Sequence, residues 1–180
     1  MKSTFMKVLR VLVLCIVIIL YTIGYLFNEH TLVNWSTPVL ISLMIAVLTT
    51  PFYKMWTWLT AEEDKILNLL CHMICVGALS YASLLAGNYY WADPASEKKE
   101  EVVVQNKYQK TRQKTRRVGR GRYVADGTRK EYYLEVVFAD GMKKNLHVSL
   151  SAYNKTSVGK TKVLTLQKGF FGLPVITKGL

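Results

Sequence analysis

The sequence is poor in the residue types on which disulfide-stabilised proteins and most catalytic sites depend. It has three cysteines and three histidines in 180 residues, and no cysteine follows position 75. Cys15, Cys71 and Cys75 all lie in apolar stretches, where a free thiol behaves as a small hydrophobic group. No disulfide framework is predicted, and the shortage of cysteine fixes no cellular compartment.

The carboxyl-terminal half also lacks a recognisable catalytic arrangement. Residues 93–180 contain one histidine, His147, and eight acidic residues without paired, triad or metal-ligand spacing. No phosphate-binding glycine loop or dinucleotide fingerprint occurs. His147 stands between Leu146 and Val148, so in a strand it points away from their face. We therefore predict that the protein is not an enzyme and uses no cofactor.

Acidic residues are scarce, at 12 against 24 basic residues, and the net charge is +12. The imbalance is confined to one half of the chain. Residues 1–92 have a net charge of +1, whereas residues 93–180 have 19 basic and 8 acidic residues and a net charge of +11. The first half is also the more apolar. The composition predicts a transmembrane region at 1–92 and a basic water-soluble domain at 93–180.

Three apolar stretches in the first half predict transmembrane helices at about 8–27, 38–59 and 66–91. The third is long enough, at ~1.5 Å per residue, to cross a hydrocarbon core of about 30 Å. Thr60 and Glu63 have capping-box spacing before it. Pro51 predicts a kink in the second helix. The first stretch is followed by no small-residue cleavage site, which favours a retained span over a signal peptide.

Small residues recur every four positions on the second and third predicted helices. Such ladders let helix backbones approach closely in lipid. The ladder residues are Ser42, Ala46 and Thr50 on the second helix and Ala78, Ala82 and Ala86 on the third. An equal alternative is that alanine and serine are simply common in membrane helices.

A polar group within the third predicted helix is a candidate functional site by default. Asn68, His72 and Cys75 share a helix face there, with Cys71 beside it. Zinc is bound by such residues, but three ligands on one helix diverge and lack a fourth. We predict no metal site, and a neutral His72 bonded to Asn68 or to a neighbouring helix.

The basic half has the patterns of a small β-domain. Strands are predicted at Glu100–Thr111, at Lys130–Phe138 with apolar alternation, around Leu146–Val148, and at Lys160–Gln167. Asp140-Gly141 predicts a hairpin turn, and residues 149–154 predict a short helical turn or loop. The predicted fold class is membrane α+β, with three transmembrane helices followed by a small antiparallel β-sheet or barrel-like domain.

A run of basic residues without an acid is the clearest candidate binding site. Two glycines interrupt the run, which predicts a mobile loop at about 112–129. Its residues are Lys110, Arg112, Lys114, Arg116, Arg117, Arg120 and Arg122. Such residues bind anionic lipid headgroups or phosphates. A solvated hairpin without a dedicated ligand is an equal alternative. Nucleic acid is disfavoured because the alternating tyrosines are better explained as core and no nucleic-acid motif occurs.

Several short motifs resemble those of a group of small uncharacterised bacterial membrane proteins. The motifs are Tyr132-Tyr133-x-x-Val136-x-Phe138-x-Asp140-Gly141, Tyr153-Asn154, Val158-Gly159 and Lys168-Gly-x-x-Gly172-x-Pro174. The resemblance covers residues 100–176. It implies a bacterial envelope protein with a β-barrel-like domain after a few spans, and it supplies no catalytic residues.

Two functions follow as hypotheses. The first is a non-enzymatic bacterial envelope protein whose β-domain binds a partner protein or anionic lipid, an immunity-type protein being one version. The alternative is a ligand-gated membrane effector whose β-domain senses a phosphate-bearing small molecule. Self-association of the helices fits either function.

The orientation in the membrane is not decided by basic residues alone, because each orientation places five near the cytoplasmic side. The first span usually dominates, and long domains translocate largely regardless of charge. We therefore expect a multi-pass protein of the bacterial inner membrane, with the amino terminus cytoplasmic and the β-domain extracytoplasmic.

Overall fold

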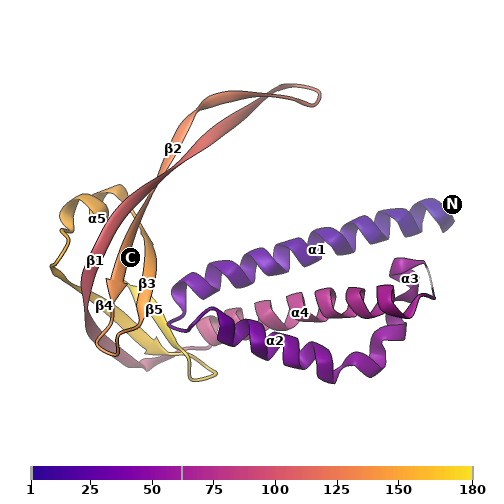
Figure 1. Ribbon diagram of the computed structural model, residues 1–180, viewed down its shortest axis with the longest axis horizontal. Coiled ribbons are helices and arrows are strands. Elements are labelled where there is room, and N and C mark those ends of the chain that lie inside the picture. The colour runs from indigo at the N-terminus through magenta and orange to yellow at the C-terminus, as the bar shows by residue number, and fades with distance from the viewer. Residues whose placement is uncertain (1, 62, 180) are drawn as a thin grey trace. The chain divides into compact units, whose positions relative to one another are not determined.

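The computed structural model describes residues 2–61 and 63–179, which form helices and a five-stranded antiparallel sheet (Figure 1). The chain divides into two compact units. The helical unit comprises the chain up to Ser96 together with Gln167–Val175, and the sheet unit comprises Glu97–Leu166 and the chain from Ile176. The predicted boundary at 92/93 lies four residues before this one, and the return of Gln167–Val175 to the helical unit was not predicted.

Two helices of the helical unit are long and apolar enough to cross a membrane. Helix α1 runs Lys2–His30 and helix α4 runs Lys65–Tyr90. Their lengths of 29 and 26 residues correspond to about 43 and 39 Å, more than the roughly 30 Å of a hydrocarbon core. These helices fit the first and third predicted spans.

The second predicted span, 38–59, is broken rather than continuous. Helix α2 covers Ser36–Leu48, the 3₁₀ helix η1 covers Thr50–Trp56, and helix α3 covers Thr57–Thr60. The axis bends by 77° at the break, so the segment is either a broken span or a re-entrant loop. The prediction of three spans is thus not confirmed. The physical reason is Pro51, which lacks the N–H that a continuing helix needs.

Threonine hydroxyls compensate for the break at the end of α2. The Thr49 hydroxyl donates to the carbonyl oxygen of Ile45 at 2.8 Å, and the Thr50 hydroxyl donates to that of Val47. The Ile45 carbonyl also accepts the Thr49 main-chain amide, but Val47 stands four residues before Pro51, which has no N–H to donate. A carbonyl left without an amide donor is costly in an apolar environment. The sequence Thr-Thr-Pro therefore makes a sharp bend tolerable there.

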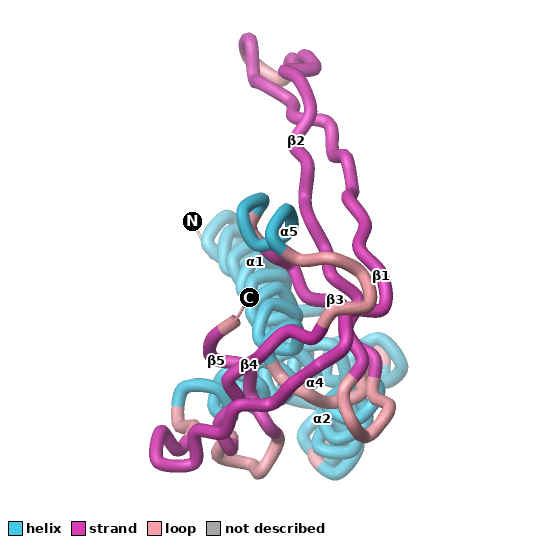
Figure 2. Tube along the Cα trace, turned by 90° about the vertical axis from the view of Figure 1, so that its left-hand side faces the viewer, coloured by secondary structure: helices cyan, strands magenta, loops and turns pink. Residues whose placement is uncertain are grey.

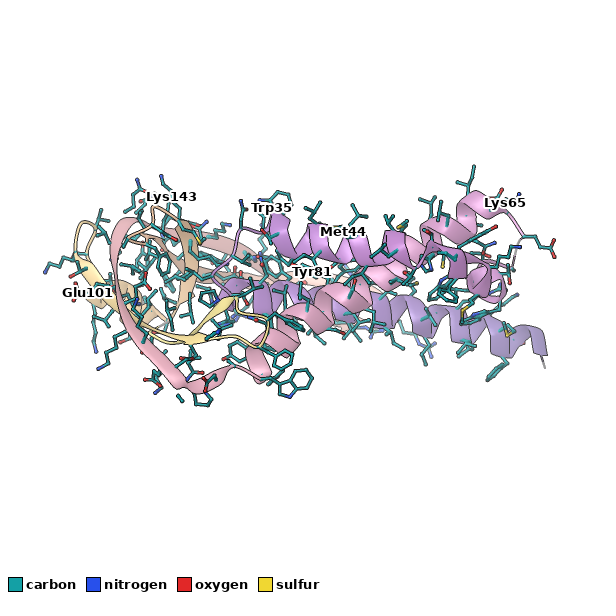
Figure 3. The ribbon with its side chains drawn as sticks, turned by 90° about the horizontal axis from the view of Figure 1, so that it is seen from below. Trp35, Met44, Lys65, Tyr81, Glu101 and Lys143 are labelled. Carbon is teal, nitrogen blue, oxygen red and sulfur yellow. The ribbon has the colours of Figure 1, made fainter. Side chains whose placement is uncertain are left out.

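Helix α4 packs against both α1 and α2, and it runs parallel to α1 and antiparallel to α2. Contacts near the middle join Tyr21 of α1 to Ile74 of α4, and contacts near the end join Phe27 to Tyr89. In the antiparallel pair, Ser80 of α4 donates to the carbonyl oxygen of Ser42 at 3.4 Å. Trp35 and Lys65 consequently mark opposite ends of this unit, with Tyr81 between the helices (Figure 3).

The small-residue ladders lie partly within these helix contacts. Each ladder has its first two members buried and its third half-buried; the first ladder runs from α2 into the start of η1, and the second lies on α4. The buried residues are Ser42, Ala46, Ala78 and Ala82, and the half-buried ones are Thr50 and Ala86. Helix α1 meets α4 closely at Gly24, where a Cβ atom would strike the Tyr81 ring.

The start of α4 differs from the predicted capping box. Asp64 is the N-cap residue, and its carboxylate accepts a hydrogen bond from the Leu67 amide at 2.8 Å. Thr60 instead donates its hydroxyl to Oδ1 of Asn68 at 2.7 Å. The capping-box prediction was wrong because Thr60 belongs to the preceding helix, which ends at Ala61 with a left-handed φ of 63°.

The sheet has the strand order β3-β2-β1-β4-β5. Its strands are β1 (Asp93–Gly119), β2 (Arg122–Val137), β3 (Lys143–Val148), β4 (Thr161–Lys168) and β5 (Pro174–Lys178). The Asp140-Gly141 hairpin is confirmed, with Gly141 at a φ of 82°. Of the two alternatives for residues 149–154, the structure shows the helical one, as α5 (Leu150–Lys155) capped by Ser149.

The core of the sheet unit lies on one face of the strands. Its members are Val102, Val104, Leu134, Val136, Phe138, Leu146, Val148, Leu164, Leu166 and Ile176. An extra residue, Gln105, interrupts the β1–β2 register after Val104. Lys107 therefore takes the next position on the core face, where its ammonium group donates to the carbonyl oxygens of Tyr153 and Thr156 at the end of α5. One lysine thus closes the carboxyl end of α5.

Candidate anion-binding surface

The candidate site is an extension of strands β1 and β2 beyond the rest of the sheet (Figure 2). The two strands stay paired from Val103 opposite Val137 out to Gly119 opposite Arg122. The prediction of a mobile loop at about 112–129 was therefore wrong, because these residues form a two-stranded ribbon. Residues 110–130, which we call the basic ribbon, contain nine basic residues and one acid.

The basic ribbon has no apolar core of its own. Every residue from 111 to 130 is exposed on both strands. An isolated two-stranded ribbon in water is only marginally stable, and close positive charges repel each other. The basic ribbon therefore presents its positive charges to solvent along its whole length.

The register distributes the predicted basic residues over two faces and the turn. Lys110, Arg112, Lys114 and Arg116 alternate along one face of β1, and Arg117 lies on the other. Arg120 and Arg122 belong to the turn and its exit. The structure therefore brings four of the seven predicted residues onto one face.

Strand β2 adds basic residues that the sequence did not single out. Arg129 lies directly opposite Arg112, and Lys130 lies opposite Thr111 on the other face. Only the strand register could have placed them beside the predicted run. Beyond this point β2 contains an extra residue near Gly127, which has a φ of 80°. The register shifts there, and the two strands stay paired on either side of the shift.

Apolar side chains accompany the arginines at the tip of the basic ribbon. Val118, Tyr123 and Val124 are exposed there, and Tyr123 pairs in register with Arg117. Gly121 allows the tight turn through its φ of 76°. Basic residues mixed with exposed aromatic and aliphatic side chains are typical of segments that bind at a membrane surface.

An aromatic stack supports the base of the basic ribbon. The Tyr108 and Tyr133 rings are stacked at 5.4 Å between centroids and 12° between planes, and His147 of β3 packs on Tyr133 at 5.3 Å. Lys110 lies with its ammonium group 5.1 Å from the Tyr133 ring centroid. As predicted, His147 is exposed and faces away from Leu146 and Val148.

Glu131 lies at the base of the basic ribbon and forms an ion pair with one of its arginines. Its carboxylate lies 3.1 Å from Nε of Arg112 and accepts a hydrogen bond from the Tyr133 hydroxyl at 3.1 Å. Desolvation acts to raise the pKa of Glu131, but the Tyr133 hydrogen bond and the charges of Arg112, Arg129 and His147 outweigh it. The pKa is therefore lowered. Glu131 thus stabilises the folded ribbon above its unfolded-state pKa, and this contribution is lost as the pH falls through the folded-state pKa.

Arg112→Gln is expected to raise the pKa of Glu131, because it removes the cation in direct contact with the carboxylate. Side-chain ¹³C NMR of the full chain in micelles, followed as a function of pH, measures this value. Arg116→Gln is the matched control, since it removes one charge from the same face farther along the strand. An equal shift in both variants would show that the pKa follows net charge and not the Arg112 contact.

A second polar site lies within the helical unit around His72, which is only 2% exposed. The Trp56 indole N–H donates to Nδ1 of His72 at 3.0 Å. The other ring nitrogen, Nε2, lies 3.0 Å from the Thr49 hydroxyl and 3.2 Å from the Ala46 carbonyl oxygen. The predicted bonding of His72 to a neighbouring segment is confirmed, with Trp56 and Thr49 as partners.

The hydrogen bonds of His72 explain its position without a ligand. It ties α4 to the end of α2 and to η1, the two segments separated by the 77° bend. Sequence reasoning did not identify Thr49 and Trp56 as its partners, because the kink predicted at Pro51 gave neither the size nor the direction of the bend that brings them together. Across residues 2–61 and 63–179, no three histidine, cysteine or acidic side chains are placed to hold a metal ion.

With the sheet unit and the helical unit described, the chain was compared with known proteins. No family model, no characterised protein and no solved structure matches it.

Proposed function

We propose that this chain is a non-enzymatic, multi-pass membrane protein whose basic ribbon binds anionic phospholipid headgroups. The observation that carries the proposal is the fully exposed stretch 111–130 at the end of two paired strands. Residues 110–130 have a net charge of +8. A paired backbone holds these charges closer together than a flexible loop would.

The charge of the basic ribbon is large enough for useful affinity. A basic residue near an anionic membrane surface contributes about 1 kcal/mol. With Lys110, Arg112, Lys114 and Arg116 on one face, and Arg129 beside Arg112, a single surface can contact several cations at once. All nine basic residues of the ribbon together would contribute up to about 9 kcal/mol, and half of them about 4–5 kcal/mol, which corresponds to dissociation constants from below about 1 μM to about 1 mM.

The tip favours lipid over an acidic protein as the partner. Tyr123 and Val118 are exposed next to arginines, and such side chains enter the headgroup region while guanidinium groups bind phosphates. Protein interfaces, in contrast, bury their apolar groups at the centre of the contact and place lysine at the rim. An acidic protein partner is the outcome to be distinguished by experiment.

The orientation that we propose is the one expected for a bacterial inner membrane protein with an extracytoplasmic sheet unit. Helices α1 and α4 are parallel, so both would cross the membrane in the same direction. The start of α1 and the end of α4 would then lie on opposite sides of the membrane. Arg10 of α1 donates to the Trp58 carbonyl oxygen, which brings the basic start of α1 to the same end as Lys54 and Lys65. These basic residues fit the cytoplasmic side.

Vesicle binding tests the proposed ligand. The full chain in nanodiscs of zwitterionic lipid should co-sediment with phosphatidylglycerol vesicles and not with phosphatidylcholine vesicles. Because exposed charges are screened over about 8 Å at 0.15 M salt and about 3 Å at 1 M salt, binding should be lost at high salt. Equal binding to both vesicles, or binding that resists salt, would contradict the proposal.

A further inference from the structure

Four exposed aromatic side chains gather where helix α4 ends. Tyr90 and Trp91 come from the end of α4, and Phe170 and Phe171 come from the turn between β4 and β5. Their side chains are 71%, 68%, 63% and 51% exposed in the same order. The Phe170 ring packs on Trp91 at 5.7 Å and on Phe171 at 5.0 Å. We call these four residues the aromatic cluster.

The turn that carries the two phenylalanines is fixed to α4 by one fully buried residue, Asn88. Its side-chain amide donates to the Leu173 carbonyl oxygen at 2.9 Å, and its side-chain oxygen accepts from the Phe171 amide at 3.0 Å. Its main-chain carbonyl oxygen accepts from the Phe170 amide at 3.2 Å. Three hydrogen bonds therefore hold the turn in one conformation.

Further contacts hold both ends of the turn to the helical unit. The Lys168 amide donates to the Ser96 hydroxyl at 2.8 Å, and the Leu32 amide donates to the Pro174 carbonyl oxygen at 2.7 Å. Gly169 touches Asn88 so closely that a Cβ atom would strike the carboxamide. The polar groups of the turn are thus directed inward, and its rings are left exposed by a rigid backbone.

The location of the aromatic cluster identifies the surface that it fits. Counting about 30 Å of helix from Arg10 along α1 reaches His30, which packs on Tyr89 next to the cluster. The cluster therefore lies at the level where α1 and α4 leave a hydrocarbon core. Tryptophan and other large aromatic side chains are favoured at this level, with one part in lipid and one part wet.

We propose that the β4–β5 turn is an interfacial membrane anchor, with Phe170, Phe171 and Trp91 inserted between the headgroups and acyl chains of the bilayer that surrounds α4. The ligand is the phospholipid surface as such, and no anionic headgroup is needed. The inference rests on neither the basic ribbon nor its ligand. Its consequence is that the chain contacts the membrane again some 75 residues after α4, at Gln167–Val175.

Spin-label depth measurements in zwitterionic nanodiscs test the anchor. A nitroxide is attached to Phe170→Cys in a chain whose three native cysteines are replaced by alanine, and collisions with oxygen and with a water-soluble nickel chelate are compared. Leu79→Cys, on the exposed face of α4, is the lipid reference. Val158→Cys, an exposed turn residue of the sheet unit, is the aqueous reference.

The oxygen-to-nickel collision ratio at position 170 is expected to be several-fold above that at position 158 and below that at position 79. A label at Phe171→Cys should give the same ranking, which guards against a local effect of one substitution. A ratio at both positions equal to that at 158 would overturn the anchor. Dipolar broadening between labels at 170 would show a second copy of the chain on the cluster, and this would also overturn it.

Discussion

Replacing the five arginines of the basic ribbon with glutamine is expected to lower the affinity for phosphatidylglycerol vesicles at least about 100-fold, since each contributes about 1 kcal/mol and 1.4 kcal/mol is tenfold. The five are Arg112, Arg116, Arg117, Arg120 and Arg122. All are exposed, so the change should leave the fold intact. Co-sedimentation of the nanodisc-bound chain with vesicles measures the effect.

The matched control removes five charges from the sheet unit outside the basic ribbon. It converts the exposed residues Lys98, Lys99, Lys143, Lys155 and Lys160 to glutamine. Because its net charge equals that of the arginine variant, any difference between the two reports position and not total charge. We expect a much smaller loss in the control. Equal losses would assign binding to the overall positive field, and unchanged binding of the arginine variant would exclude the ribbon as the site.

The basic residues of the ribbon were visible in the sequence, but their arrangement on two paired strands was not. Strands β2 and β3 were predicted because Leu134, Val136 and Leu146 alternate between a buried face and a wet one. Residues 112–129 show no such alternation, because neither face is buried. Their strand structure comes from backbone pairing that continues outward from an established register, and a pattern of side chains cannot report it.

The helical unit shows the same limit in another form. Long apolar runs predicted α1 and α4, and Pro51 predicted a kink. The 77° bend and the hydrogen bonds that the Thr49 and Thr50 hydroxyls donate beside it had no sequence pattern to announce them. Asn88 was not singled out by the sequence, because a single amide near the end of an apolar helix forms no pattern with its neighbours. Its side-chain partners lie 83 and 85 residues away in the chain, and they are main-chain groups that have no sequence signature.

Gly169→Ala is expected to destabilise the helical unit by about 2–4 kcal/mol, through overpacking and through disruption of buried hydrogen bonds. The added Cβ would strike the carboxamide of Asn88, which is fully buried and cannot move into open space. Thermal unfolding in micelles measures the effect, at about 2–4 °C per kcal/mol for a chain of this size. Gly119→Ala is the matched control, since nothing lies within 4 Å of its Cβ position. It should be close to neutral.

A double-mutant cycle with Asn88→Ala separates a collision at Asn88 from a general intolerance of alanine in the turn. Asn88→Ala alone should cost about 1–3 kcal/mol, because the Phe171 amide loses its partner. It also removes the atoms that the Gly169→Ala methyl would strike. The second substitution should therefore cost much less in that background, giving a coupling of at least about 0.5 kcal/mol. Additive losses would mean that Asn88 and Gly169 act independently, and the turn would then owe its position to other contacts.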